Sequence, residues 1–269
     1  CDPDGYRRSA RVDGETGIVA VRALPDVAAL EVRWTGGAAR GLLDLSARVA
    51  RLFDLRADVV TIGRQLRRDS RLARDWPAAG VRVPGTWDPF EIAVRALLGQ
   101  QVSVAAARTL AGRLVERCGT PLGRAAADGI THLFPTPAQV AGARLDGLGL
   151  TGARVAALRA LAGAVAAGTL DLEAPRAPEE TVAALQRLPG IGAWTAQYVA
   201  MRALGETDAF PAGDLGVRRA LAVAGRLPGE REVLARAERW RPWRAYAAIA
   251  LWTGPTRTTR RPFTPRSTA

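Results

Sequence analysis

Residues 188–196 read Leu188-Pro189-Gly190-Ile191-Gly192-Ala193-Trp194-Thr195-Ala196 and form the most informative stretch of the chain. Proline followed by glycine ends one helix and turns the chain, and the two glycines permit dihedral angles and close approaches that a Cβ would obstruct. A new helix is expected to begin directly after the turn. Such a turn directs backbone N–H groups and a helix N-terminus outward, which suits phosphate binding. A bare Gly-x-Gly would more often be an ordinary turn, but this longer stretch is more specific.

The N-terminal part predicts a small α+β domain over residues 1–60. Strands are expected at Tyr6–Val12, Gly17–Ala23 and Ala29–Trp34, because apolar residues alternate there and turn signals separate the segments. Helical spacing follows from Leu42 to Phe53. One helix against a small antiparallel sheet is a common two-layer arrangement.

From Pro84 onward the pattern is helical, and it predicts a mainly α domain over residues 61–252 with a helix-hairpin-helix at 186–204. Ser103 is expected to cap one of the helices. No convincing strand pattern follows residue 60. The segment 253–269 holds Thr, Arg and Pro without periodicity, so we predict a disordered tail there. The helices expected after the hairpin's first helix lie at 193–204, 215–224, 231–239 and 243–252.

The net charge of +12 and the isoelectric point of 11.3 favour a polyanionic partner. The sequence contains no Lys, so all 38 basic residues are Arg. Part of this excess therefore reflects base composition of the genome. The missing Lys has a chemical consequence, because a Lys Schiff base is the usual amine nucleophile toward a sugar aldehyde. Only the N-terminal amine of this chain could form one.

The content of Cys and His excludes several kinds of metal site. Two Cys and one His cannot make a zinc ribbon, a four-cysteine iron–sulfur cluster or a multi-histidine site. We therefore expect no required cofactor. Signal-peptide and membrane-spanning patterns are absent, so a cytoplasmic location is expected, at the nucleoid if the source is a prokaryote.

The stretch 188–196 resembles the hairpin of the helix-hairpin-helix DNA glycosylase superfamily, and its flanks resemble the AlkA-type branch, 3-methyladenine DNA glycosylase II. The resemblance extends from about Tyr6 to about Trp252. It implies a helix-hairpin-helix glycosylase fold and a base excision repair enzyme that flips alkylated bases out of double-stranded DNA and hydrolyses the N-glycosidic bond. A monomer is expected. The further matching segments are 51–55, 87–91, 95–100 and 239–244.

Two aspartates follow the hairpin, and either could serve as the catalytic carboxylate. From the residues alone, Asp214 suits the N-cap of a helix that begins at Leu215, and Asp208 suits a solvated loop. The resemblance selects Asp214. A carboxylate can stabilise the oxocarbenium-like sugar that forms when a cationic alkylated base leaves, or it can orient the attacking water. The sequence leaves the balance of these two roles open.

An aromatic pocket for the flipped base is implied by the resemblance. Trp194 and Tyr198 lie four residues apart and so share one helical face, for which core packing is the alternative. Trp252 joins them in the implied pocket, and Leu215 replaces an aromatic residue there. A cationic base gains cation–π stabilisation between such rings. Because bifunctional members carry a Lys where this chain has Trp194, we expect hydrolysis without strand cleavage.

The resemblance places three further functions on this chain. Gln101 is the expected wedge that fills the gap left by the flipped base, where the AlkA-type pattern has an apolar residue. Structural Na⁺ or K⁺ is expected at the hairpin. The residues implied to bind the DNA backbone are Gly190, Ile191, Gly192, Ala193 and Thr195, and the carbonyl ligands of the cation would be those of Gln186, Leu188 and Ile191.

Three other functions are compatible with parts of the pattern. A non-enzymatic helix-hairpin-helix module would use the hairpin for DNA binding alone, but such modules are usually short and repeated. A glycosylase for oxidised, mismatched or deaminated bases is a second alternative. An RNA-binding protein would need stacking aromatic residues on a sheet, and the strand region has little more than Tyr6 and Trp34.

Overall fold

The computed structural model describes residues 5–37, 41–123, 129–173 and 177–254. The chain forms two compact units that alternate along the sequence. The first unit comprises Cys1–Leu55 and Pro84–Gly205, and the second comprises Arg56–Val83 and Glu206–Ala269. The predicted division into sequence domains at residue 60 stays a prediction. Of the predicted disordered tail, residues 255–269 lie outside the described part of the chain.

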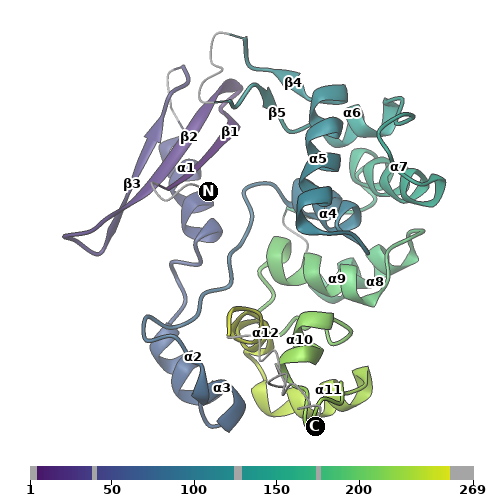
Figure 1. The fold of residues 1–269 in the computed structure, drawn as a ribbon. Coiled ribbons are helices and arrows are strands. Elements are labelled where there is room, and N and C mark those ends of the chain that lie inside the picture. The colour runs from purple at the N-terminus through teal and green to yellow at the C-terminus, as the bar shows by residue number, and fades with distance from the viewer. Residues whose placement is uncertain (1–4, 38–40, 124–128, 174–176, 255–269) are drawn as a thin grey trace, which may run out of the picture. The chain divides into compact units, whose positions relative to one another are not determined.

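The first unit begins with the predicted antiparallel sheet (Figure 1). Its strands are β1 (Tyr6–Val12), β2 (Glu15–Leu24) and β3 (Ala29–Trp34), in that order across the sheet. Apolar residues of alternating position bury one face of the sheet against α1 (Leu42–Leu52). The period-two pattern therefore predicted the strands correctly.

The helical part of the first unit surrounds a large apolar core. Leu97, Leu114, Leu158 and Leu185, contributed by four different helices, are each fully buried in it. Pro89 begins α4 behind the N-cap Asp88, and Ser103 caps α5 as predicted. The helices are α4 (Pro89–Leu98), α5 (Val104–Cys118), α6 (Pro137–Gly142), α7 (Gly152–Ala166), α8 (Pro178–Arg187), α9 (Ala193–Val199) and the π-helical turn η2 (Ala200–Leu204).

The second unit consists of short helices (Figure 1). Their bounds are α2 (Val59–Leu66), α3 (Ser70–Arg74), α10 (Leu215–Ala220), α11 (Glu230–Ala237), the 3₁₀ turn η3 (Glu238–Trp240) and α12 (Arg244–Thr253). The Trp240 indole is 1% exposed and donates to the Asp69 carboxylate, 3.1 Å away. Arg236 also donates to Asp69. Burial raises the pKa of Asp69, but the hydrogen bonds from Trp240, Arg236 and the Arg71 N–H have the larger effect. The pKa of Asp69 is therefore lowered overall.

A buried ion pair joins the sheet to α4. Arg8 on β1 donates to Glu91 at 2.8 Å, and the two side chains are 14% and 12% exposed. The Arg8 guanidinium also lies 5.6 Å from the centre of the Trp87 ring. Arg95 donates to the other oxygen of Glu91 at 2.7 Å. Burial raises the pKa of Glu91, but the two guanidiniums outweigh burial and lower it overall.

The structure also contains elements that the sequence analysis did not predict. Helices α2 and α3 were not assigned, and β4 (Thr120–Pro121) pairs with β5 (His132–Leu133) well after residue 60. The expectation of no strand there was therefore wrong. Two-residue strands are too short to show a period. None of the helices in the described ranges has both the length and the apolar character needed to cross a membrane.

Candidate active site

The hairpin lies between α8 and α9, as the sequence predicted. The Ile191 N–H donates to the Leu188 carbonyl at 3.3 Å, which closes the turn. Gly190 has a φ of +75°, and a Cβ at this position would lie 2.9 Å from the Cβ of Ala157. A glycine is therefore required here both by the left-handed backbone and by close packing on α7.

The hairpin residues predicted to bind the DNA backbone differ in exposure. Gly190, Gly192 and Ala193 are exposed, whereas Ile191 is 5% and Thr195 2% exposed. The Thr195 hydroxyl accepts a hydrogen bond from Gln100 at 2.9 Å. The side chain of Thr195 is therefore buried and bonded within the protein, so of this residue only the backbone N–H is left for the predicted contact with a phosphate.

The turn after α4 places the predicted wedge on the surface. Gln101 is exposed and has a φ of +55°, in the left-handed region that glycine favours. Its neighbour Gln100 donates from the side chain to the Gly190 carbonyl at 2.9 Å and to Thr195. Arg154, at the start of α7, donates to the backbone carbonyl of Gln100 at 2.7 Å. Sequence reasoning assigned no role to Gln100; its position beside Gln101 was the available signal.

Trp194 and Tyr198, the predicted first half of the base pocket, stack on one another. Their ring centres are 5.4 Å apart and the rings are inclined by 16°. Both side chains are half-buried. Arg202, one helical turn further on, donates to the Tyr198 hydroxyl at 3.1 Å, and its guanidinium lies 5.6 Å from the centre of the Tyr198 ring. Spacing of four residues along a helix therefore produced the expected common face.

Asp214 and Trp252, in the second unit, form the other half of the predicted site. Asp214 is the N-cap of α10 and accepts from the Val217 N–H at 2.9 Å through Oδ1. The same oxygen accepts from the Trp252 indole at 2.7 Å. Leu215, the next residue, is 46% exposed. Capping fixes the carboxylate in place, which is compatible with a catalytic role.

Gly216 allows this close approach of indole and carboxylate, and sequence reasoning missed it. A Cβ on Gly216 would lie 3.0 Å from Asp214 Oδ1 and 3.0 Å from Cδ1 of Trp252. A side chain there would need one of the two groups to shift. The available signal was a glycine in the first turn of a helix, where glycine is otherwise unfavourable.

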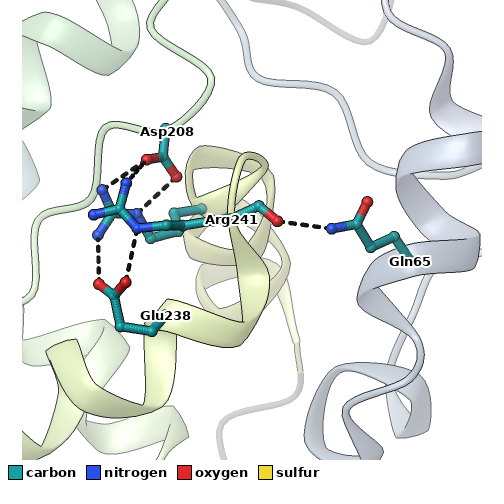
Figure 2. Close-up of polar contacts among 5 residues, drawn as sticks. Gln65, Asp208, Glu238 and Arg241 are labelled. Atoms are coloured by element: carbon teal, nitrogen blue, oxygen red, sulfur yellow. Dashed lines mark hydrogen bonds and ion pairs between the residues drawn. The ribbon is translucent and has the colours of Figure 1, made fainter.

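Asp208, the other candidate carboxylate, is held by arginines. Arg244 donates to both of its oxygens, at 2.8 and 2.9 Å, in a bidentate pair. Arg241 also pairs with Asp208, and Glu238 accepts from the same arginines (Figure 2). The Arg241 carbonyl in turn accepts from Gln65 at 2.7 Å (Figure 2). This cluster links the turn before α12 to α2. The contacts of Asp208 therefore indicate a structural role for this carboxylate.

The predicted site residues therefore fall into two groups, one in each compact unit. The hairpin, Gln101, Trp194 and Tyr198 belong to the first unit, and Asp214, Leu215 and Trp252 belong to the second. In the first group Trp194 stacks on Tyr198, and in the second group Trp252 donates to Asp214. In the described ranges, no three His, Cys, Asp or Glu side chains gather in a way that could hold a metal ion.

Family models match both parts of the chain. Residues 1–88 match the AlkA N-terminal domain, and residues 94–245 match the HhH-GPD superfamily base excision DNA repair protein model. A DNA-3-methyladenine glycosylase 2 from Escherichia coli is 37% identical over 255 residues, which cover 92% of this chain and 84% of that protein. A probable bifunctional transcriptional activator/DNA repair enzyme AlkA from Mycobacterium tuberculosis is 43% identical over 251 residues. That match covers 92% of this chain, and the chain spans half the length of the mycobacterial relative.

The fold is also that of solved glycosylases. The 3-methyladenine DNA-glycosylase from Archaeoglobus fulgidus superposes with a TM-score of 0.71 at 25% identity, covering 91% of this chain and 85% of that one. Sequence and structure thus agree on the resemblance that the hairpin indicated. The chain belongs to the HhH-GPD superfamily of base excision DNA repair proteins, in the branch that contains DNA-3-methyladenine glycosylase 2.

Proposed function

We propose that this chain is a DNA-3-methyladenine glycosylase that flips alkylated bases out of double-stranded DNA and hydrolyses their N-glycosidic bond. The observation that carries the proposal is the oriented carboxylate of Asp214, which caps α10 and accepts from Trp252 at 2.7 Å. Its relatives in E. coli and A. fulgidus are named for 3-methyladenine.

Asp214 is the proposed catalytic residue. An alkylated purine carries a positive charge and leaves readily, so the main demand on the enzyme is to stabilise the oxocarbenium-like sugar. A fixed carboxylate meets that demand, and it also accepts a proton from, or orients, the water that attacks the sugar. Two hydrogen bonds hold the carboxylate in place without a reorganisation step at the moment of reaction.

The base pocket uses aromatic faces. Trp194 and Tyr198, in the first unit, stack on one another and offer their outer faces to a base, and Trp252, in the second unit, is the further aromatic residue that the resemblance implies. A cationic base gains roughly 0.5–2 kcal/mol per favourable cation–π contact, whereas a neutral base gains less. Stacking of this kind tolerates different bases, so we propose a broad range of alkylated purines rather than a single substrate.

The hairpin and the turn after α4 supply DNA binding. Gly190, Gly192 and Ala193 are exposed residues, and their N–H groups are proposed to bind a phosphate together with those of Ile191 and Thr195. Gln101 is the proposed wedge.

We propose that the protein acts as a monomer at the nucleoid.

A monovalent cation, Na⁺ or K⁺, also fits the hairpin. The carbonyls of Gln186 and Leu188 lie at or just after the C-terminal end of α8, where the helix dipole favours a cation, and Ile191 follows in the turn. The Leu188 carbonyl accepts a long bond of 3.3 Å from Ile191, which leaves a lone pair for a ligand bond. Thermal unfolding in KCl, NaCl and choline chloride at equal ionic strength tests this; equal melting temperatures would exclude the ion.

The catalytic proposal is tested by incubating the protein with methylated duplex DNA and analysing free bases and strand breaks. Released methylated purines, with strand breaks only after alkali treatment, are expected. The chain has no Lys and carries Trp194 in the hairpin helix, so a lyase step is not expected. Strand breaks before alkali would contradict the monofunctional part, and absence of base release would contradict the glycosylase itself.

A further inference from the structure

We propose that Gln100 and Arg154 are positioning residues that hold Gln101 in a fixed place relative to the hairpin. When the hairpin binds the DNA backbone, the Gln101 wedge then lies at the base stack. This inference rests on the proposed function and adds a structural device to it. It starts from Gln100, whose side-chain amide and backbone carbonyl contact three separate segments of the first unit.

The side chain of Gln100 makes the contact with the hairpin. Its Nε2 donates to the carbonyl of Gly190 at 2.9 Å and to the hydroxyl of Thr195 at 2.9 Å. Gly190 belongs to the turn that is proposed to bind phosphate, and Thr195 belongs to the first turn of α9. One amide group therefore ties the turn after α4 to the hairpin turn and to the first turn of α9.

The backbone of Gln100 is held by Arg154. The guanidinium donates to the Gln100 carbonyl at 2.7 Å, and this carbonyl belongs to the peptide unit that leads into Gln101. Arg154 itself lies at the start of α7, where its own N–H donates to Thr151. The same helix packs against Gly190 through Ala157. Helix α7 therefore contacts both the backbone of Gln100 and the hairpin turn that the Gln100 side chain binds.

Gln101 has a backbone conformation that needs such support. A non-glycine residue in the left-handed region is unfavourable, and surrounding contacts must hold it there. The residue is exposed, so packing of its own side chain does not supply that hold. The bonds of Gln100 to Gly190, Thr195 and Arg154 supply it instead, and they fix Gln101 relative to the proposed phosphate-binding turn.

A wedge acts on base pairing and stacking and not on bond cleavage. An enzyme that flips a base must supply the free energy that unstacks and unpairs this base. The free energy required is smaller when the base is already unpaired. A misplaced wedge should therefore slow excision of a paired lesion and spare an unpaired one. A residue needed for the chemistry or for the general fold would slow both.

The experiment measures single-turnover excision of one methylated purine in two duplexes, one with the lesion paired and one with it in a one-nucleotide bulge. Wild-type protein is tested first; if it excises neither, the proposed function fails. Given wild-type activity, Gln100→Ala and Arg154→Met are expected to slow the paired substrate roughly ten- to a hundredfold and the bulged one far less. Equal slowing of both substrates, or no slowing, would overturn the inference.

Matched controls come from the same unit. Gln139 uses its amide to tie α6 to Thr120, at 3.1 Å, and Arg113 donates to the Leu148 carbonyl at 3.2 Å. Gln139→Ala and Arg113→Met remove the same kinds of bond elsewhere, and neither is expected to separate the two substrates. If Gln100→Ala does not fold, Gln100→Glu keeps the size but loses the donors to Gly190, and the same comparison applies.

A double-mutant cycle shows whether the effect passes through the wedge. If Gln100 acts only by placing Gln101, then adding Gln100→Ala to Gln101→Ala should slow the paired substrate no further. Fully additive losses would mean that Gln100 acts by another route, and the positioning role would be wrong.

Discussion

Asp208 and Asp214 lie close together in the sequence of the second unit, yet different kinds of donor hold them. Asp208 is clamped by the guanidiniums of Arg244 and Arg241, at 2.8 and 2.9 Å in the Arg244 pair. Asp214 accepts from the Val217 N–H and the Trp252 indole, which are neutral. A guanidinium adds positive charge beside the carboxylate that it binds, whereas a backbone N–H and an indole N–H orient a carboxylate oxygen without adding charge. The second arrangement suits a group that must stabilise a cation.

Removing the charge of Asp214 tests this comparison most strongly. Asp214→Asn keeps the size of the side chain and an oxygen that can accept from Val217, but it removes the negative charge. We expect excision to fall by at least about a hundred- to a thousandfold, because electrostatic stabilisation of the transition state is lost. Binding to an abasic-site duplex should be retained. Turnover near that of the wild type would show that another group carries the reaction.

Trp252→Phe separates orientation of the carboxylate from stacking of the base. A phenyl ring keeps an aromatic face for the proposed base pocket, but the donor to Asp214 is gone. A hydrogen bond to a charged group contributes about 1.5–3 kcal/mol, so we expect kcat to fall about ten- to a hundredfold with little change in KM. Steady-state kinetics on methylated DNA measure both. A rise in KM with unchanged kcat would mean that Trp252 serves the pocket alone.

Gly216→Ala moves the same two groups apart without removing either. The new Cβ would lie 3.0 Å from both the indole and the carboxylate, so one must shift by a few tenths of an ångström. A several-fold loss of kcat is expected, smaller than for Trp252→Phe. Alanine favours a helix over glycine by about 1 kcal/mol, so the melting temperature should not fall. Lower stability together with lower kcat would point to a disturbed fold.

Asp208→Asn should have the smallest effect on excision. It removes the bidentate carboxylate partner of Arg244, which is 13% exposed, and leaves this guanidinium with the more distant carboxylate of Glu238, at 3.4 Å. We expect a loss of about 1–3 kcal/mol in the free energy of unfolding, measured in urea, and an excision rate at 25 °C within about twofold of the wild type. A large catalytic loss in a stably folded variant would remove the distinction between the two aspartates.

Local patterns predicted most of the fold. The strands β1 to β3, the capped helix α5 and the helices α9 to α12 follow from alternation, helical spacing and caps such as Ser103. Helix α2 was missed although Ile62 and Leu66 lie on one face, because it is short and Gly63 and Arg64 interrupt its apolar pattern. The strands β4 and β5 are too short to leave a pattern.

The candidate site could be predicted only in part. The resemblance supplied Asp214, Trp194, Tyr198 and Trp252, but no local rule could pair Asp214 with an indole 38 positions away. The left-handed backbone of Gln101 was equally hidden, because nothing about glutamine indicates it. Such features depend on which segments the fold brings together.

The ion pair between Arg8 and Glu91 bears on how this protein can be shortened in the laboratory. Arg8 stands on the first strand, whereas Glu91 lies in α4 and is 12% exposed. A fragment that starts after the sheet would keep the carboxylate and lose this guanidinium and the ring contact with Trp87. Glu91 would keep its second partner, Arg95, at 2.7 Å, so the fragment should lose only part of the roughly 3–5 kcal/mol that a fully unpaired buried charge costs. Fragments for expression should therefore either keep β1 or carry Glu91→Gln.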